Sequence, residues 1–241
     1  MKPWHIKDPQ AFQELKRQIE SKYATLCVFV EKDVVFIRGG LGIEAQDGRE
    51  VDHYSIEIRL PDNYPNKGIP IVKETGGRLP ESLDQHLPYG IACLFLRDER
   101  YKCYPQGSTI IDFIEGPVKD FFLWQVDYKL NKGKSSIGER GHGVKGIIEF
   151  YSEELKTSDV VVIRDFLNYL SKQEVKGHWD CYCGSKKKMR DCHFDILLHL
   201  KSNIPCDVAR RSLDLINDYI LNNRYPSSNG TESRYKEYPN F

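Results

Sequence analysis

Three cysteines and a histidine lie within thirteen positions, in the stretch WDCYCGSKKKMRDCH that ends at His193. Cys181 and Cys183 are separated by one residue, and Cys192 stands directly before His193. Three thiolates and one imidazole complete the tetrahedral coordination sphere of Zn²⁺ and leave no position for a catalytic water. We therefore predict a closed, structural zinc site here rather than a catalytic one.

The Cys-Gly-Ser that begins at Cys183 and the adjacent Cys192-His193 pair resemble the zinc motif at the C-terminus of the SecA preprotein-translocase ATPase. That motif occurs as an appended module in many bacterial proteins, so the resemblance implies one structural zinc and a docking role. The basic residues 186–188 and Arg190 lie between the ligands. Such a run is typical of a solvated face, and contact with an acidic partner or with nucleic acid remains an open alternative.

If the cluster is closed, a reactive thiol must lie elsewhere, and the best candidate is Cys93 in the stretch GIACLFL. A thiolate is a strong nucleophile, and its thioester reacts with amines without a metal or cofactor. Cysteine is also among the most buried residue types, so a core position is the alternative for Cys93. We expect Cys27 to be a core residue, Cys206 to be structural, and Cys103 to be either a second thiol near Cys93 or an incidental, partly buried residue.

Hydrophobic patterns define the elements that must position Cys93. Asp8 and Pro9 begin a helix expected over residues 9–22. Alternating, turn-bounded segments predict an antiparallel meander of four strands, at residues 25–31, 33–39, 52–60 and 69–75. A helical pattern follows Ser108 as a cap and restarts after Gly116-Pro117. Residues 129–146 are polar and rich in glycine, which predicts a loop.

This order of elements resembles the ubiquitin-conjugating enzyme family over about residues 8–130. The resemblance implies an α+β fold with an N-terminal helix, a four-stranded antiparallel meander and C-terminal helices, and it implies that Cys93 carries a thioester. It rests on a strand followed by a Tyr-Pro and proline signature, and on the region around the cysteine: Ile56, Ile58, Leu60, Pro61, Tyr64, Pro65, Pro70, Val72, His86, Gly90, Cys93 and Leu94.

The chain departs from the familiar eukaryotic members of that family near the cysteine. Those members carry a His-Pro-Asn element ten positions before the cysteine, whereas here the sequence HLP begins seven positions before Cys93 and lacks the asparagine. The donor that stabilises the oxyanion is therefore open, with His86 and backbone amides near Cys93 as candidates. The usual downstream tryptophan is also absent, and Tyr101 and Tyr104 are candidates for its place.

Such departures are typical of bacterial relatives, and the most similar family acts in cyclic-oligonucleotide-based antiphage signalling (CBASS). The resemblance implies an antiviral cysteine transferase with Cys93 as nucleophile and His86 as support for the oxyanion or the amine. Its implied partner is the C-terminus of a cGAS-like nucleotidyltransferase or a ubiquitin-like modifier. It would act either with a separate adenylating enzyme or directly on the nucleotidyltransferase. The alternative is a non-catalytic protein-binding module with the same fold and a zinc docking domain.

Composition narrows the cellular setting. The 241 residues contain 35 Lys plus Arg and 35 Asp plus Glu, so no overall charge favours nucleic acid or an anionic membrane as partner. The apolar runs are too short to span a membrane, and the N-terminus lacks a secretory signal. An odd number of cysteines, partly clustered with histidine, indicates a reducing compartment. We expect a cytoplasmic protein without a membrane partner, and we do not expect nucleic acid to be its partner.

Two domains and a tail are expected. We place the conjugating-enzyme-like domain at residues 1–155, the helical zinc domain at 156–224 and a flexible tail at 225–241. The stretch GHGVKG has the G-x-G-x-x-G spacing, but polar residues precede it instead of a strand, so we predict no nucleotide cofactor. A loop that brings His142 or Lys145 toward Cys93 is a further hypothesis.

Overall fold

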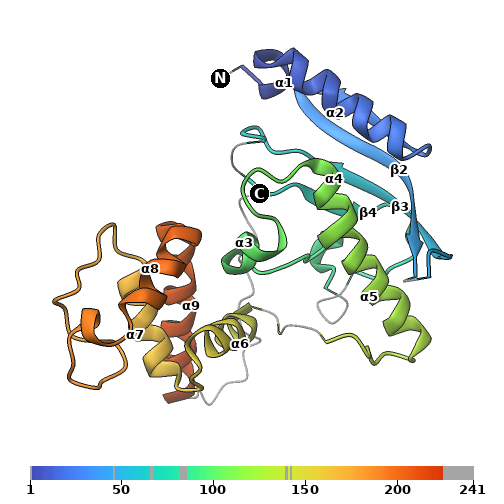
Figure 1. Ribbon diagram of the computed structural model, residues 1–241. Helices are drawn as coiled ribbons and strands as arrows, with labels where there is room; N and C mark the ends of the chain where they lie inside the picture. The colour runs from blue at the N-terminus through green and yellow to red at the C-terminus, as the bar shows by residue number, and fades with distance from the viewer. Residues whose placement is uncertain are drawn as a thin grey trace. The chain divides into compact units, whose positions relative to one another are not determined.

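The computed structural model describes residues 2–45, 47–65, 68–81, 86–138, 141 and 143–224, and it divides the chain into two compact units (Figure 1). The first unit comprises the described residues up to Phe95 and those from Cys103 to Gly138. The second comprises Leu96–Lys102 and the described residues from Gly141 onward. In these described ranges, no helix is long and apolar enough to cross a membrane.

A four-stranded antiparallel sheet forms the centre of the first unit, with its strands in sequence order. This confirms the α+β class and the predicted meander. The strands are β1 (Leu26–Glu31), β2 (Val34–Glu44), β3 (Glu50–Arg59) and β4 (Ile71–Glu74). Strand β2 continues past its predicted end at residue 39 through two outward-facing glycines. A Cβ on Gly40 would lie 2.3 Å from His53 Nε2, so a larger residue here requires the His53 side chain to move.

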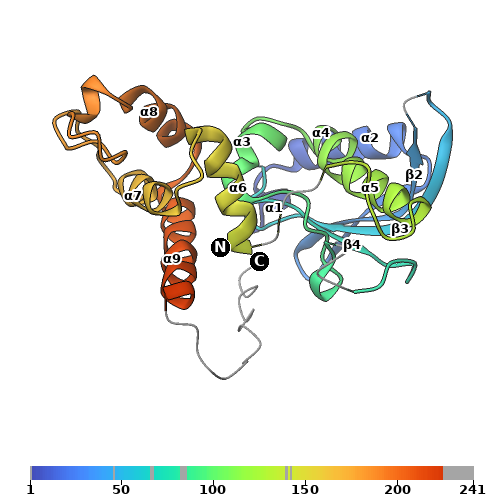
Figure 2. The ribbon, with the colours of Figure 1, turned by 90° about the horizontal axis from the view of Figure 1, so that it is seen from below.

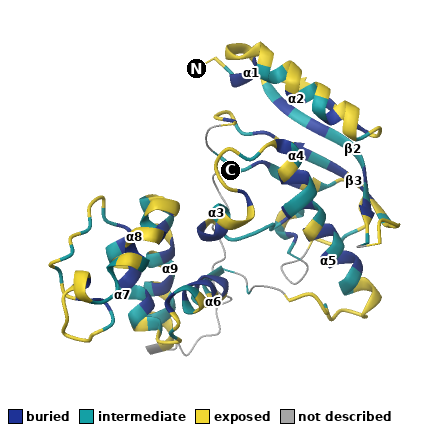
Figure 3. Cartoon of the chain, in the orientation of Figure 1, coloured by how far each residue is buried: buried dark blue, intermediate teal, exposed yellow. Residues whose placement is uncertain are grey.

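One face of the sheet is buried and the other is more open (Figure 3). Along β2, the inward positions are Val35, Ile37, Leu41 and Ile43. Helices α2 (Pro9–Lys22), α4 (Ile110–Phe113) and α5 (Lys119–Leu130) lie on the buried side, as Figure 2 shows. Tyr54 of β3 stacks on Phe122 of α5 with 4.6 Å between ring centroids, which fixes the helix against the sheet.

The helix boundaries follow from local capping. The Asp8 carboxylate accepts a hydrogen bond from the Ala11 N–H at 3.0 Å, which confirms the predicted start of α2. Helix α4 is capped by Thr109 rather than by Ser108, because Thr109 and Asp112 form a reciprocal capping box. Helices α4 and α5 are joined by a π-helical turn at Ile114–Val118, where the predicted Gly-Pro interruption occurs.

Four helices form most of the second unit: α6 (Gly143–Leu155), α7 (Val160–Leu170), α8 (Phe194–Asn203) and α9 (Cys206–Arg224). Two shorter elements precede them in sequence, η2 (Arg97–Glu99) and α3 (Arg100–Cys103). The largest buried side chains of this core include Phe150, Tyr151 and Phe166, and helix α7 packs along α9. The loop that contains the cysteine cluster connects α7 to α8.

The division between the units differs from the expected boundary at residue 155. The residues of helix α6 up to 146 were expected to form a loop. The whole helix was expected to belong to the first domain, which was predicted to end at residue 155. Instead, Ile147, Phe150 and Tyr151 recur at helical spacing and are buried in the core of the second unit. Their apolar face therefore assigns α6 to the helical unit. The expected tail at 225–241 and His142 lie outside the described residues.

Candidate functional site

Cys93 lies at the end of a short extended segment at the edge of the sheet. Ile91 forms an isolated antiparallel bridge with Lys73 of β4, and the Ala92 N–H donates a hydrogen bond to the Val72 carbonyl at 2.8 Å. The Cys93 N–H donates to the His86 carbonyl, also at 2.8 Å. The backbone therefore holds the two predicted site residues, Cys93 and His86, directly together.

The same contacts restrict how an oxyanion is stabilised. Backbone amides near Cys93 were candidate donors, but the amides of Ala92 and Cys93 already donate to carbonyl groups within the fold. A carbonyl oxygen held at Cys93 in this conformation must therefore receive its hydrogen bond from another group. The His86 side chain and the other backbone amides near Cys93 stay predicted donors.

The Cys93 side chain is partly buried, and burial raises the pKa of its thiol. A thiol with a raised pKa is mostly protonated near neutral pH and is a weak nucleophile in that state. Any attack by Cys93 therefore requires that its proton be removed when a partner binds or when the surrounding loop rearranges.

His86 packs against an aromatic pair that the sequence did not reveal. Its backbone has a φ of 54°, in the left-handed region that non-glycine residues seldom adopt. Its imidazole meets the Trp124 ring edge to face, with 4.9 Å between centroids and an interplanar angle of 82°. Trp124 is 7% exposed and stacks on Tyr128, one helical turn further along α5, at 4.9 Å. This tryptophan is the aromatic partner of the site.

The tyrosines proposed for that place have other surroundings. Tyr104 packs against Phe113 in the core of the first unit, with 5.0 Å between ring centroids. Tyr101 belongs to the second unit, where its ring lies 6.2 Å from that of His199. The available signal for Trp124 was its i, i+4 spacing from Tyr128 on a predicted helix.

The remaining cysteines outside the cluster differ in exposure. Cys27 was predicted to be a core residue, and this prediction is wrong: Cys27 is exposed, because its neighbours Leu26 and Val28 occupy the inward positions of β1. Cys103 is exposed as well. Cys206 is partly buried at the start of α9, with its Sγ 2.9 Å from Lys201 Nζ. Cys27 and Cys103 are thus accessible thiols on the same unit as Cys93.

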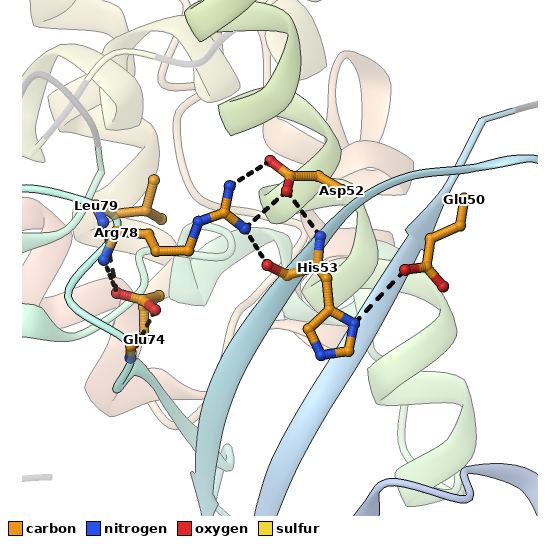
Figure 4. Close-up of polar contacts among 7 residues, drawn as sticks. Glu50, Asp52, His53, Glu74, Arg78 and Leu79 are labelled. Atoms are coloured by element: carbon orange, nitrogen blue, oxygen red, sulfur yellow. Dashed lines mark hydrogen bonds and ion pairs between the residues drawn. The ribbon is translucent and has the colours of Figure 1, made fainter.

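An ion-pair cluster holds the loop that leads toward His86 (Figure 4). The Arg78 guanidinium donates to the two Asp52 carboxylate oxygens at 2.7 and 3.1 Å and also to the His53 carbonyl. The Glu74 carboxylate accepts hydrogen bonds from the N–H groups of Gly76 at 2.7 Å and Arg78 at 3.0 Å. Arg78 therefore ties the start of the loop after β4 to strand β3, and Glu74 holds the turn that carries Arg78.

The charge of Asp52 is stabilised by the same contacts. Partial burial acts against ionisation, but hydrogen bonds from the Arg78 guanidinium and from the His53 N–H outweigh it and lower the pKa of Asp52. Arg78 also lies over the Tyr54 ring, 4.7 Å from its centroid. The cluster is therefore a structural support for the loop, with its charges satisfied.

A groove of about 510 Å³ lies on the more open face of the sheet. Its lining does not include Cys93 or His86, so it is separate from the site described above. The groove is lined by Glu31, Lys32, Val34, Phe36, Glu57, Arg59, Ile71, Lys73 and Ile91.

In the second unit, the four predicted metal ligands come together. Cys183 Sγ lies 3.4 Å from Cys181 Sγ and 3.6 Å from Cys192 Sγ. His193 Nδ1 lies 3.2 Å from Cys181 Sγ and 3.1 Å from Cys192 Sγ. All four atoms are within 4.8 Å of one another. Tetrahedral zinc with Zn–S bonds of about 2.3 Å requires sulfur–sulfur separations of about 3.8 Å, so the donor set fits the ion after a small expansion.

The fold around the cluster explains this convergence. The Cys181 N–H donates to the Lys187 carbonyl at 2.9 Å, and the Met189 N–H donates to the Trp179 carbonyl at 2.7 Å, so the two arms of the loop run antiparallel. Gly184 has a φ of 72°, as the turn after the first ligand pair requires. Met189 is fully buried and anchors the loop in the core of the helical unit.

The surroundings of Cys181 oppose its ionisation. Burial raises the pKa of Cys181 to about 12. Burial of Cys183 also acts against ionisation, but hydrogen bonds from Ser185 and the neighbouring thiols lower its pKa. When bound, a zinc ion would supply the positive charge that keeps all three sulfurs as thiolates. Its four protein ligands would make it a structural site with no open position.

A buried carboxylate was missed by the sequence analysis. Asp98 accepts a hydrogen bond from the Tyr151 hydroxyl at 2.6 Å, and the Ser212 hydroxyl lies 2.9 and 3.0 Å from the two carboxylate oxygens, so its single proton is shared between them. Burial raises the pKa of Asp98 despite these bonds. The contacts attach the segment Leu96–Lys102, which begins three residues after Cys93, to helices α6 and α9.

Comparison of the chain with protein-family models, curated proteins and solved structures finds no match. No family is therefore assigned to the chain, and its function is inferred from the arrangement of its own residues.

Proposed function

We propose that the protein is a ubiquitin-conjugating-like cysteine transferase in which Cys93 is the nucleophile. The observation that carries the proposal is the hydrogen bond from the Cys93 N–H to the His86 carbonyl. It joins the backbone of Cys93, whose side chain is partly buried, to the backbone of His86, whose imidazole packs on Trp124, at the edge of an antiparallel meander covered by helices. The four-strand order is compatible with the fold that the resemblance implies.

The proposed reaction has two acyl-transfer steps. The Cys93 thiolate attacks the carbonyl carbon of a C-terminal acyl-adenylate, a C–S bond forms, and AMP leaves with the electrons of the broken C–O bond. A separate adenylating enzyme supplies that acyl-adenylate from ATP. An amine then attacks the thioester, a C–N bond forms as the C–S bond breaks, and the leaving Cys93 thiolate takes up the proton that the amine loses. The His86 imidazole supports the oxyanion or the incoming amine.

The resemblance favours a particular partner and setting. The acyl group would come from the C-terminus of a cGAS-like nucleotidyltransferase or from a ubiquitin-like modifier, and the reaction would prime the nucleotidyltransferase in bacterial antiviral defence. The helical unit, with one structural zinc held by Cys181, Cys183, Cys192 and His193, would serve for docking.

The test is an adduct measured by intact mass. The protein is expressed with its neighbouring genes, and the adduct on wild type is compared with those on Cys93→Ala, Cys27→Ala and Cys103→Ala. Cys27 and Cys103 are exposed thiols on the same unit and serve as matched controls. We expect the adduct to disappear only in Cys93→Ala, and Cys93→Ser to trap a more stable ester. An adduct that persists in Cys93→Ala contradicts the proposal.

A second candidate function is a non-catalytic protein-binding module of the same fold. The observation that favours it is the raised pKa of the Cys93 thiol, which burial causes. Under this alternative, Cys93 in native protein resists alkylation while Cys27 and Cys103 react, and no adduct forms with any partner. Alkylation followed by peptide mass mapping distinguishes the two functions.

A further inference from the structure

Two aromatic rings and an ammonium group come together beside the cysteine cluster. Tyr169, at the end of α7, stacks on Trp179 in the following loop, with 5.5 Å between ring centroids and 30° between ring planes. The Lys172 Nζ lies 4.8 Å from the Tyr169 centroid and 4.7 Å from the Trp179 centroid. All three residues are partly exposed. We call these three residues the aromatic platform.

The backbone of the loop places a run of lysines next to this platform. Asp180 and Lys188 form an antiparallel bridge, and the Met189 N–H donates to the Trp179 carbonyl at 2.7 Å. The Tyr169 hydroxyl donates to the Asp180 carbonyl at 3.0 Å, which fixes the platform to the same arm of the loop. The lysine run therefore folds back beside Trp179.

The loop is basic although the whole chain is neutral. From Lys172 to Asp191 the loop has six basic residues and three acidic ones. Of the three acids, Asp180 is paired with Lys188 at 2.8 Å and Asp191 with Arg190 at 3.5 Å. Lys176, Lys186 and Lys187 are exposed and make no ion pair within the part of the chain that the structure describes. Three thiolates and one zinc ion would add a single negative charge, which leaves the surface positive.

We propose that the aromatic platform, together with Lys176, Lys186 and Lys187, binds single-stranded nucleic acid. Planar bases stack on aromatic side chains, and lysines contact the phosphates between them. A base takes the place of the Lys172 ammonium over the two rings, and that ammonium then contacts a phosphate. An acidic polypeptide satisfies the lysines equally well but has no planar base for the rings, so the aromatic pair favours nucleic acid.

This site is independent of the proposed chemistry at Cys93. Its residues all belong to the second unit, whereas Cys93 and His86 belong to the first. Failure of nucleic-acid binding would therefore leave the transferase proposal intact, and failure of adduct formation would leave this site intact.

The first experiment measures binding of labelled twelve-nucleotide dT and rU strands to the full-length, zinc-loaded protein by fluorescence anisotropy across a range of salt concentrations. The variant Lys186→Ala/Lys187→Ala is compared with Lys132→Ala/Lys134→Ala, which removes two exposed lysines of the first unit. We expect the first variant to lose more than about tenfold in affinity at low salt and to reduce the slope of log K against log salt by about 1.4, at about 0.7 per lost phosphate contact. The control is expected to bind like wild type.

The second experiment tests the aromatic platform. Trp4 and Trp124 are buried in the first unit, so Trp179 is the tryptophan available to report on a bound base. We expect both oligonucleotides to quench tryptophan fluorescence in wild type, and Trp179→Phe to abolish the quenching while its zinc content stays unchanged. Polyglutamate is the competitor of comparable charge. Absence of oligonucleotide binding contradicts the proposal. Equal competition by polyglutamate for the oligonucleotide site, with no quenching of tryptophan fluorescence by oligonucleotides, also contradicts it and would indicate a surface for acidic protein.

Discussion

The imidazole of His86 meets the indole of Trp124 edge to face, with 4.9 Å between ring centroids, while the His86 carbonyl accepts a hydrogen bond from the Cys93 N–H at 2.8 Å. One residue therefore connects the thiol to the helix behind it. Its backbone contact orients the cysteine, and its side chain rests on Trp124 of α5. Substitutions at His86 and Trp124 can separate these two roles.

His86→Gly and His86→Ala distinguish the backbone of His86 from its ring. Glycine adopts the φ of 54° without a steric penalty, whereas alanine does not, so we expect His86→Ala to be less stable than His86→Gly by about 1 kcal/mol. Both variants lack the imidazole, and under the proposed function both lose transfer by about a hundredfold, as expected when one oxyanion donor is removed. Urea unfolding and the adduct assay measure the two effects. Transfer at the wild-type rate in His86→Gly would exclude a role for the imidazole.

Trp124 is expected to act through packing. Trp124→Ala removes most of a buried ring and should lower the free energy of unfolding by about 3–5 kcal/mol, whereas Trp124→Phe preserves an aromatic edge beside His86 and should cost less. Under the proposed function, Trp124→Phe retains more transfer activity than His86→Gly. The reverse order of activities would show that the indole has a role beyond supporting His86.

The pH dependence of Cys93 alkylation follows from its burial. An ordinary thiol has a pKa of about 8.5 and is half ionised at that pH. Because burial raises the pKa of the Cys93 thiol, its thiolate fraction should keep increasing at higher pH values. The measurement is the rate of iodoacetamide labelling of Cys93 between pH 7 and 10, in a Cys27→Ser/Cys103→Ser background. A labelling rate that levels off below pH 8.5 would contradict the buried environment. Addition of a productive partner should shift the profile to lower pH.

Much of the fold could be predicted from the sequence because its signals are local. Asp8-Pro9 marks the start of α2, and alternation marks the strands. The spacing of Cys181, Cys183, Cys192 and His193 predicted a cluster, and the structure brings their side chains together. The phase of alternation in β1 also carried the information that Cys27 points outward, since Leu26 and Val28 are the apolar inward pair. Cysteine's general preference for burial led to the wrong prediction there.

Other features depend on contacts between distant residues. Trp124 lies 38 positions from His86 in sequence, so no local pattern relates them. Helix α6 begins within a glycine-rich stretch, which led to the prediction of a loop. Its apolar face outweighs that local signal because it packs into the core of the second unit. Asp98 would be expected on the surface from its charge. Its burial requires hydroxyl donors from Tyr151 and Ser212, on helices that follow much later in the chain.

Asp98 should make the second unit more stable at mildly acidic pH. Its folded-state pKa is raised above the unfolded value of about 3.9. Its favourable contribution is therefore fully present below the unfolded pKa and is lost as pH rises through the folded pKa. We expect the stability of wild type to increase relative to Asp98→Asn as pH falls from 7 toward 4. Urea titrations that follow Trp179 fluorescence in a Trp4→Phe/Trp124→Phe background measure this difference, and parallel pH profiles would contradict it.

Removal of the carboxylate has a separate consequence. Asp98→Ala leaves the buried hydroxyls of Tyr151 and Ser212 without their acceptor, which should destabilise the second unit by about 3 kcal/mol at pH 7. Asp98→Asn retains an acceptor oxygen and should be less affected. If Asp98→Ala were as stable as wild type, the segment Leu96–Lys102 would not depend on this carboxylate for its attachment to the helices.

The cysteine cluster should bind about one zinc per chain and should stabilise the second unit only. Chelation removes the metal, and Cys192→Ser removes one of its ligands, so in both cases the link between the two arms of the loop around Met189 is lost. We expect the Tm of this unit to fall by more than about 10 °C, equivalent to about 2 kcal/mol. Cys206→Ser, outside the ligand set, is the matched control and should keep its zinc. Metal analysis and thermal unfolding followed at Trp179 measure both effects. Protein purified without chelator that contains no zinc would contradict the assignment, and loss of zinc in Cys206→Ser would show that the ligand set differs.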